Sequence, residues 1–513
     1  MNELENEATL KGERADRLKR LKLLEDSGVT PYADKFDRSN VCQDIKEELI
    51  GKKVSIAGRI MLFRDMGKIA FAQLQDFSGR AQIVFRVGDD LSPEVYKQII
   101  KVLDIGDFIG VEGEVFVTKK GEVSVMVKEY TFLSKALRPL SDKWHGLKDV
   151  ELKYRKRYLD LIMNEDTKER FIFRSNFVRE LRNFYQENGF FEVDTPVLCN
   201  TASGALARPF STHHNALDID VSLRIAPEIY LKEVIVGGFE KVFEIARVFR
   251  NEGTDPSHLQ DFTMIEHYAA YWDYKMNMEF TEKMLVTIIE KLKGTLKLDI
   301  MDRDGELRQI DMTPPWKVIS MRDIILKDSG IDIDNYTTAD ELREKIVADG
   351  ISIDDMEKLG LGNLIDALYK EVSRKKVINP TFLINHPTSL SPLARKNKDN
   401  PLVTDRFQLL INGWEILNAY SELIDPADQK ERFNQQAEAK DGGDEEALTK
   451  DLDYVEAMEY GMPPVSGWGM GLERILALLT NQLNLRDVVL FPLMRPEQDT
   501  SNVANEKNKD AKK

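Results

Sequence analysis

The sequence is poor in cysteine, with only Cys42 and Cys199 among its 513 residues. Two cysteines so far apart exclude a disulfide framework and a zinc site built from cysteines. Long apolar runs are also missing, since none approaches the roughly 18 residues that a membrane-spanning helix needs. The first residues lack the basic-then-apolar layout of a signal peptide. We therefore expect a cytoplasmic protein with no membrane segment.

A positive charge balance is absent as well, because 72 Lys and Arg residues stand against 88 Asp and Glu residues, a formal net charge of −16. This balance argues against a protein that coats nucleic acid nonspecifically. Local basic faces are still allowed, since lysines and arginines gather at residues 11–22 and 153–157. Each cluster is equally compatible with a solvated helix face.

The first part of the chain divides into two regions with different residue patterns. Residues 1–48 have the pattern of a charged helical extension. Residues 49–136 instead contain short strand-like runs, separated by glycine and charged turns. The runs lie at 54–60, 69–74, 81–85, 108–113 and 123–127. Five short strands over about 80 residues predict a small β-barrel such as an OB-fold. Residues 137–167 are interpreted as a linker.

From residue 168 the apolar period becomes helical, and Gly189 is a suitable stop for the helix. The residues of the apolar face are Phe177, Leu181, Phe184 and Tyr185. Strands and helices then mix up to residue 497, with an acidic helical insertion at about 336–375. We expect an α+β domain over 168–497, and residues 498–513 are predicted to be a disordered polar tail.

Neither a GxxxxGK[ST] loop nor a strand-borne GxGxxG helix start is present, so the common phosphate-binding loops are missing. Two arginine-centred segments remain. A strand-like run at 242–253 carries Arg250, and a glycine-rich strand at 463–479 leads into an apolar helix that carries Arg474. Alone, Arg250 would be a surface residue and Arg474 part of a packing corner. An arginine nevertheless suits a phosphate, because its planar and permanently charged fork donates two hydrogen bonds.

These two segments, with the helix-strand unit that ends at Pro196, resemble motifs 2, 3 and 1 of the class II aminoacyl-tRNA synthetases. The flanking stretches are similar to the lysine-specific branch of that family. They lie at 207–210, 212–218, 223–228, 418–423 and 490–496, within a likeness that runs from about residue 50 to 496. The resemblance implies an OB-fold anticodon-binding domain, followed by a catalytic domain with an antiparallel sheet flanked by helices.

An enzyme of this kind would activate L-lysine with ATP to lysyl-adenylate and pyrophosphate, and then transfer lysine to the 3′ end of tRNA(Lys). Such chemistry needs placement and charge neutralisation more than a general base. The resemblance implies that Arg250 bridges the α-phosphate and the lysine carboxylate, and that Arg474 holds the γ-phosphate. The further ATP-binding residues that it implies are Glu252, His258, Phe262 and Glu415.

Substrate choice should appear as charge, because both ammonium groups of lysine must be satisfied in a partly dry cleft. The resemblance places Glu228 at the α-ammonium, and Glu266 and Glu422 at the ε-ammonium. The complete set of lysine-binding residues that it implies is Gly204, Glu228, Glu266, Tyr268, Asn418, Tyr420 and Glu422. Any one of the glutamates alone could equally be a structural salt-bridge partner.

Magnesium is implied by the same likeness. Glu415 and Glu422 match family carboxylates near the Mg²⁺ ions that bridge the ATP phosphates, and Mg²⁺ prefers oxygen ligands. A third expected carboxylate falls on Gln408, whose amide can contact a metal without neutralising it. The family would use up to three Mg²⁺ ions, and Gln408 leaves their number open here. The loop after His258 also departs from the family pattern, so no nucleotide contact is assigned to Leu259 or Asp261.

In the predicted barrel, an exposed aromatic residue on a strand would offer a stacking platform for a base, worth about 1–3 kcal/mol. The family binds the anticodon with such a group, and the matching residues are Arg64, Phe71, Gln82 and Glu122. Phe71 alone could equally belong to the core. Motif 1 with Pro196 is the family's dimer element, so the resemblance also implies a homodimer.

Three other functions were weighed. An aspartate or asparagine synthetase shares this architecture, but the three glutamates and residues 418–422 argue against it. A paralogue that joins an amino acid to a protein lysine typically lacks the anticodon barrel. A catalytically silent tRNA-binding regulator is disfavoured by the intact pair of arginines.

Overall fold

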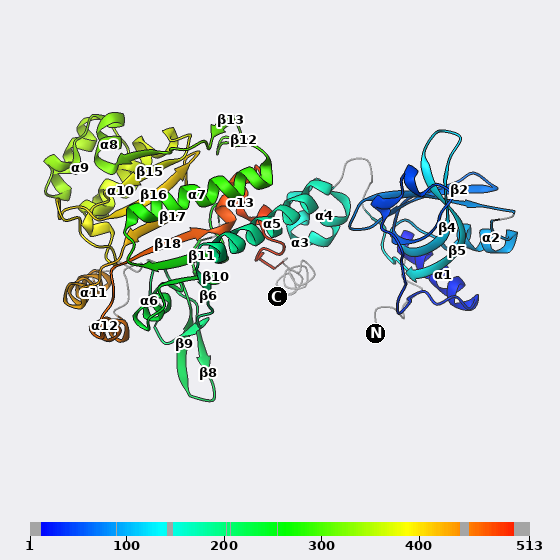
Figure 1. Cartoon of the computed structure of the whole chain (residues 1–513), viewed down its shortest axis with the longest axis horizontal. Coiled ribbons are helices and arrows are strands. Elements are labelled where there is room, and N and C mark those ends of the chain that lie inside the picture. Colours follow the sequence, from blue (N-terminus) through cyan, green and yellow to red (C-terminus); the bar gives the residue numbers. More distant parts are fainter. Residues whose placement is uncertain are drawn as a thin grey trace, which may run out of the picture. The chain divides into compact units, whose positions relative to one another are not determined.

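The computed structural model describes residues 12–496, except 89, 141–146, 202, 206, 254 and 442–450. The chain divides into two compact units, Met1–Lys148 and Asp149–Lys513, which are described separately (Figure 1). The predicted tail at 498–513 lies outside the described residues. No helix in the described part of the chain is both long and apolar enough to cross a membrane.

The first unit is a closed barrel of five strands in the order β1-β2-β3-β5-β4. Its strands are β1 (Lys53–Asp65), β2 (Ile69–Gln75), β3 (Arg80–Arg86), β4 (Phe108–Val117) and β5 (Val123–Ser134). Along β2 every second residue is buried, which is the period expected of a strand with one face toward a barrel core. The predicted five-stranded barrel is confirmed, and each predicted run lies in one strand.

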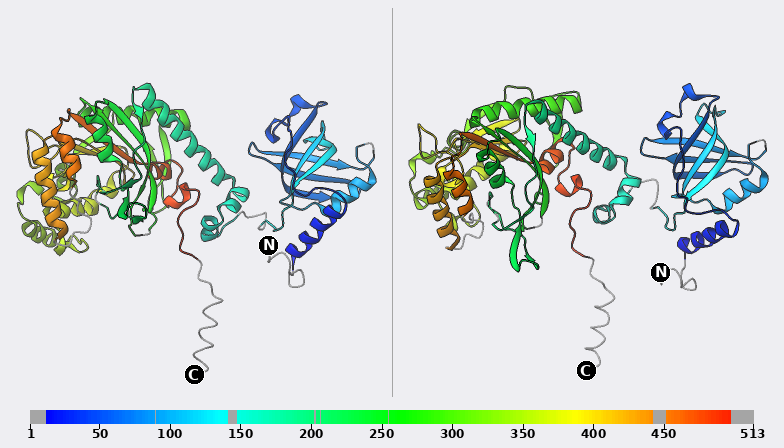
Figure 2. Two further views of the ribbon diagram at one scale, coloured as in Figure 1. Left: turned by 90° about the horizontal axis from the view of Figure 1, so that it is seen from below. Right: turned by 60° about the horizontal axis from the view of Figure 1, so that its bottom comes forward.

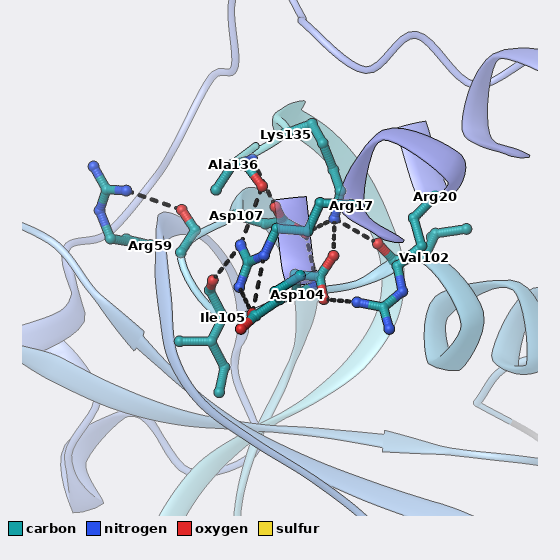
Figure 3. Close-up of polar contacts among 11 residues, drawn as sticks. Arg17, Arg20, Arg59, Val102, Asp104, Ile105, Asp107, Lys135 and Ala136 are labelled. Atoms are coloured by element: carbon teal, nitrogen blue, oxygen red, sulfur yellow. Dashed lines mark hydrogen bonds and ion pairs between the residues drawn. The ribbon is translucent and has the colours of Figure 1, made fainter. Parts of the chain in front are cut away.

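Helices cover parts of this barrel. They are α1 (Glu13–Asp26), η2 (Cys42–Asp44), η3 (Glu47–Leu49) and α2 (Pro93–Val102). A buried ionic cluster fixes α1 to the barrel (Figure 3). Lys135 contacts Asp104 at 2.5 Å and Asp107 at 2.8 Å, while Arg20 pairs with Asp104. Arg17 donates to the carbonyl oxygens of residues 105 and 136.

These contacts fit neither interpretation of the basic clusters. Arg17 and Arg20 join α1 to the barrel, and Arg17 is buried. In the second cluster, Arg157 is fully buried, pairs with Asp160 at 2.5 Å and donates to the carbonyl oxygen of Leu490 at 3.0 Å. The solvated helix face is therefore wrong for Arg17 and Arg157, because buried partners far along the chain hold them.

The second unit is built on an eight-stranded sheet in the order β14-β15-β16-β17-β18-β11-β10-β6. Its strands are β6 (Phe191–Glu192), β10 (Lys241–Phe249), β11 (Asp261–Ala270), β14 (Lys317–Ser320), β15 (Thr381–Ile384), β16 (Arg406–Ile411), β17 (Trp414–Ser421) and β18 (Val465–Gly471). The six central strands are antiparallel, and only the outermost pair at each edge is parallel. The predicted antiparallel sheet is confirmed.

Two long helices and one short helix pack against this sheet and contribute to the largest core. They are α5 (Glu165–Glu187), α7 (Tyr274–Lys293) and α13 (Leu472–Leu479). The predicted apolar face of α5 is buried, with Phe177 and Leu181 fully covered. The helix ends at Glu187, and Gly189 follows with a positive φ of 78°. The prediction of this helix and its stop from the 3.6-residue period is confirmed.

Smaller elements surround the sheet. The strands are β7 (Leu198–Cys199), β8 (Ser211–His214), β9 (Ile219–Leu223), β12 (Lys297–Met301) and β13 (Leu307–Asp311). The helices are α3 (Val150–Arg155), α4 (Arg157–Met163), α6 (Glu228–Val236), α8 (Met321–Ser329), α9 (Ala339–Ala348), α10 (Leu361–Val372), α11 (Pro426–Asp441) and α12 (Leu452–Glu459). Short 3₁₀ turns are η4 (Ile333–Asn335), η5 (Met356–Lys358), η6 (Arg374–Lys376), η7 (Thr388–Leu390) and η8 (Leu485–Val488).

Two of these groups bear on the predictions. Helices α9 and α10 lie in the predicted insertion at 336–375 and share a separate apolar core with α8. Strands β8 and β9 form an arm that projects away from the sheet (Figure 2). The arm ends in a turn with Leu217, which is exposed.

Candidate active site

A cavity of about 390 Å³ opens over the central strands of the second unit. It is lined by every residue that was predicted to bind ATP or lysine, apart from Glu422, and the doubtful metal position Gln408 does not line it either. These lining residues are Gly204, Glu228, Arg250, Glu252, His258, Phe262, Glu266, Tyr268, Glu415, Asn418, Tyr420 and Arg474. The structure therefore brings together residues from motifs that are more than 200 positions apart in the sequence.

Glycines of β18 make room for this cavity, because β18 lies between β11 and β17. Gly467 pairs with Tyr268 on one side and Tyr420 on the other. A Cβ atom at Gly467 would overlap the carboxylate of Glu422 and the ring of Tyr268. A Cβ at Gly469 would come within 3.5 Å of Glu266 Cγ. The glycine-rich motif thus lets large polar side chains of the neighbouring strands fold over the sheet.

Arg250 and Arg474 both face the cavity. Arg250 follows β10, donates through Nε to the carbonyl oxygen of Ile225 at 3.3 Å, and lies 5.2 Å from the centre of the Phe262 ring. Arg474 lies in the first turn of α13 and donates to the carbonyl oxygen of Glu415 at 3.3 Å. Within the described residues neither guanidinium forms an ion pair. Both forks therefore remain available to an anion.

The electrostatics around Arg250 include charges of both signs. Burial lowers the pKa of Arg250, and the nearby carboxylates of Glu252 and Glu266 oppose this effect. The positive charge of Arg474 lowers the pKa further. Arg250 is thus close both to acidic groups and to a second cation. An anion bound between the two arginines would relieve their repulsion.

The loop between β10 and β11 is held by Asp255. This carboxylate accepts hydrogen bonds from the Ser257 amide at 2.6 Å and the Ser257 hydroxyl at 2.8 Å, and it lies 2.7 Å from His258 Nδ1. Although burial opposes it, these contacts lower the pKa of Asp255 to about 2. His258 is therefore positioned at the cavity by a neighbour in its own loop. Leu259 packs with the core and also lines the cavity, and Asp261 pairs with Arg247.

The opposite end of the cavity is acidic. Tyr420 donates to Glu228 Oε1 at 2.6 Å, and Tyr268 donates to Glu266 Oε2 at 3.3 Å. Burial and the charge of Glu228 raise the pKa of Glu266 well above its usual value, although Arg250 lowers it. Burial raises the pKa of Glu422 to about 8, against the opposing effect of Lys232. Because these pKa values are raised, positive charge brought into the cavity would favour the ionised forms of both glutamates.

Sequence reasoning missed Lys232, which lies fully buried beneath this acidic end. Its Nζ is 2.5 Å from Glu228 Oε1 and 2.6 Å from Glu422 Oε2. Glu422 is thus engaged with Lys232 and does not line the cavity. The spacing of four residues between Glu228 and Lys232 on α6 was an available signal, because such pairs share one face of a helix.

Arg406 was missed for a different reason. It lines the cavity, donates through Nε to Asn418 Oδ1 at 2.7 Å, and donates through Nη1 to Leu390 O and Ser391 Oγ, both at 2.8 Å. It therefore fixes Asn418, a predicted lysine-binding residue. A basic residue at the start of a strand carries no local signal of burial.

The residues at the predicted metal position fit a limited magnesium site. Glu415 lines the cavity, whereas Gln408 is buried on β16 opposite Asn418. Over the described part of the chain, no group of three or more His, Cys, Asp or Glu residues could hold a metal. A Mg²⁺ ion here would need phosphate and water oxygens for most of its ligands, as is usual for nucleotide-bound Mg²⁺.

In the barrel, the predicted anticodon residues gather on one outer face. Phe71 pairs with Arg64 on β1, and its neighbours Ala70 and Ala72 point into the core. Gln82 on the adjacent strand donates to Ser124 Oγ at 2.8 Å. Glu122 precedes β5 and is exposed. Phe71 is half-buried and lies outside the barrel core.

Comparison with known families matches residues 149–495 to the tRNA synthetases class II (D, K and N) and residues 54–133 to the OB-fold nucleic acid binding domain. A lysine–tRNA ligase of Syntrophomonas wolfei subsp. wolfei is 47% identical over 497 residues, covering 96% of this chain and 99% of the relative. That of Carboxydothermus hydrogenoformans is 48% identical over 483 residues, covering 94% and 97%. That of Bacillus thuringiensis is 46% identical over 493 residues, also covering 94% and 97%. All three relatives are named for lysine, not for aspartate or asparagine.

Proposed function

The chain belongs to the class II tRNA synthetases of the D, K and N group, and on this premise we propose that it is an enzyme that activates lysine with ATP and transfers it to tRNA. The observation that carries the proposal is one cavity lined both by Arg250 and Arg474, which form no ion pair among the described residues, and by the buried Glu228 and Glu266. The arginines suit the phosphates of ATP, and the glutamates suit the ammonium groups of lysine.

In the first step, a lysine carboxylate oxygen forms a bond to the α-phosphorus of ATP, and the bond from that phosphorus to the pyrophosphate oxygen breaks. Arg250 is close to Glu266 and to Arg474, so we assign it to the contact with both the lysine carboxylate and the α-phosphate. Arg474 would hold the distal phosphates. In the second step, a terminal ribose hydroxyl of tRNA attacks the acyl carbon of lysyl-adenylate, and AMP leaves. Fixed charges at these positions stabilise the charge that develops in each step.

The acidic end selects for lysine. Glu228, with the backbone of Gly204, would receive the α-ammonium, and Glu266 with Tyr268 would receive the ε-ammonium. The backbone of Gly204 has a positive φ of 91°, and a Cβ there would come within 3.0 Å of Glu228 Cβ. Aspartate would place a further carboxylate among buried glutamates, which is strongly unfavourable without an extra cation.

Enzymes of this family use Mg²⁺ with ATP, and we assign Glu415 as the principal protein carboxylate near that ion. When bound, Mg²⁺ supplies charge neutralisation for the phosphates. Gln408 offers an amide oxygen without a charge, and Glu422 serves the lysine pocket through Lys232. Fewer ions than the family's three would therefore be bound tightly.

The outer face of the barrel would bind the tRNA anticodon, with Phe71 stacking on a base and Gln82, Glu122 and Arg64 contacting its polar groups. The proposed division is an extension (1–48), an anticodon domain (49–136), a linker (137–167) and a catalytic domain (168–497). The boundary between the two compact units, after Lys148, falls within that linker. A homodimer would form through the region of β6 to β9. Exposed apolar side chains there include Phe191 and Leu198, and the exposed Phe239, which follows α6, lies with its ring 6.1 Å from that of Phe191.

The decisive experiment measures exchange of labelled pyrophosphate into ATP with each amino acid in turn. We expect exchange with lysine and none with aspartate or asparagine. Exchange with aspartate in place of lysine would overturn the substrate assignment. Absence of exchange with every amino acid would instead favour a silent tRNA-binding protein.

A further inference from the structure

We propose that Lys232 is a positioning residue of the lysine pocket: it holds Glu228 and Glu422, and it sets the pocket's charge so that an amino acid with two ammonium groups neutralises it. The inference rests on the proposed function and explains why the pocket would select an amino acid with two ammonium groups. Lys232 itself would not touch the substrate, because it is fully buried and does not line the cavity.

The ammonium group of Lys232 is held by ionic contacts and by aromatic rings. Its ammonium bridges Glu228 on its own helix and Glu422 beyond β17, at 2.5 and 2.6 Å. Three tyrosine rings enclose the same ammonium, with centroids at 5.6 to 5.8 Å. These rings belong to Tyr268, Tyr420 and Tyr454. Tyr420 also donates to Glu228, so Lys232 and Tyr420 together fix the oxygen Oε1 of that residue.

The net charge of these groups matches the charge of the two ammonium groups of lysine. The amine-binding end holds the carboxylates of Glu228, Glu266 and Glu422 and the ammonium of Lys232, which leaves two negative charges when all are ionised. Lysine brings two ammonium groups, so the occupied pocket is neutral. The substrate's carboxylate would pair with Arg250, so these two charges are counted together and apart from the amine-binding groups. A buried cluster that is neutral avoids the large cost of an uncompensated charge.

The empty pocket agrees with this count. Burial and neighbouring carboxylates raise the pKa of Glu266 and that of Glu422, so the free site favours protons where the substrate would place ammonium groups. For Lys232, burial lowers the pKa, but Glu228 and Glu422 outweigh it and the net shift is upward. Lys232 therefore stays charged and is the fixed member of the cluster.

A plain structural salt bridge is the competing explanation, and a double-mutant cycle separates the two. Lys232→Met leaves three carboxylates for two substrate ammonium groups, an excess of one negative charge. Glu422→Gln leaves an excess of one positive charge when lysine is bound. The double variant Lys232→Met with Glu422→Gln is neutral again. Charge balance therefore predicts that the double variant is better than either single variant.

The measurement is the lysine KM and kcat in pyrophosphate exchange with the full-length chain. We expect each single variant to raise the lysine KM at least about tenfold, and the double variant to recover at least about threefold of that loss. The KM for ATP should change less than about twofold in all three variants. Unfolding temperatures of the three variants show whether any loss comes from a failure to fold.

A second readout uses norleucine, which has the length of lysine and no ε-ammonium. Glu422→Gln leaves one negative charge, which the single ammonium of norleucine neutralises. The preference for lysine over norleucine, as a ratio of kcat/KM, should therefore fall at least about tenfold in this variant. A purely structural role for Lys232 and Glu422 would leave that ratio unchanged.

The outcomes are distinct. A wild-type chain without lysine-dependent exchange would refute the proposed function. An active wild type whose double variant is as poor as, or poorer than, the single variants would refute only the role of Lys232. An unaltered lysine KM in Lys232→Met would refute it as well.

Discussion

Two buried lysines in this molecule are surrounded almost alike and do different work. In the barrel, Lys135 lies between Asp104 and Asp107, and in the catalytic unit Lys232 lies between Glu228 and Glu422. Each side chain is fully buried. The barrel cluster is closed, because each of its carboxylates has a cation (Figure 3).

The pocket cluster is open. Glu266 is buried beside it, and within the described residues this carboxylate forms no ion pair. Closed ionic clusters stabilise one conformation, whereas an open cluster leaves charge to be satisfied by a ligand. The ratio of carboxylates to cations, more than burial itself, distinguishes the binding site from the structural site.

The largest expected effect removes an unpaired charge from the cavity. Arg250→Ala should lower pyrophosphate exchange about 10²- to 10³-fold, because it removes a preorganised cation from the position where charge develops. Since Arg250 has no ion-pair partner in the described structure, its loss should not lower the unfolding temperature. A loss of stability that matches the loss of activity would show that Arg250 mainly stabilises the fold.

The closed cluster should respond in the opposite way. Lys135→Met leaves Asp107 without its cation and should destabilise the barrel by about 3–5 kcal/mol. Lysine-dependent exchange without tRNA should be nearly unchanged, because the catalytic unit is a separate compact unit. Chemical denaturation followed by a barrel-specific probe measures the first quantity. An exchange defect as large as that of Arg250→Ala would break the distinction between the clusters.

A third variant tests the outer face of the barrel. Phe71→Ala should weaken tRNA charging by about 1–3 kcal/mol, because a stacking platform for a base is lost. Exchange without tRNA should be intact. The control is Phe63→Ala, which removes a partly buried side chain that packs against the barrel core. A fall in unfolding temperature for Phe71→Ala as large as that for Phe63→Ala would assign Phe71 to the core.

Local patterns in the sequence were sufficient for much of this architecture. The two-residue period located the barrel strands, and the 3.6-residue period located α5, because both depend on which face of one element is apolar. Motif register located Arg250, Arg474 and the glutamates. Lys232 and Arg406 were missed, since their burial depends on partners nearly 200 positions and 12 positions away, respectively.

Charge patterns were the least informative. Arg17 and Arg20 lie in a basic run that is typical of a solvated or nucleic-acid-binding helix, yet they join α1 to the barrel. Arg20 pairs with Asp104, which is 84 residues later in the chain. No local rule specifies such a partner, because it is the closure of the barrel that brings the two residues together.

The smallest expected effect concerns pH and follows from the open cluster. Burial raises the pKa of Glu266 and raises that of Glu422 to about 8, so the empty pocket holds protons at neutral pH. Bound ammonium groups favour the ionised carboxylates, so lysine binding must release protons. The lysine KM should therefore fall as pH rises from 6 to 8, by at most about tenfold per unit for each proton released, and then level off.

Other groups that face Glu422 do not titrate in this range, since the pKa values of Lys232, Tyr268, Tyr420 and Tyr454 are all raised. His258 lies in the same cavity, so the profile is also recorded for His258→Gln. The raised pKa values of these glutamates also make the stability of the protein depend on pH. The free protein loses stability as pH rises between the unfolded and folded pKa values of the glutamates. Bound lysine should therefore restore more stability at pH 8 than at pH 6. A lysine KM that is flat from pH 6 to 8 would mean that the pocket is closed without its substrate, as the barrel cluster is.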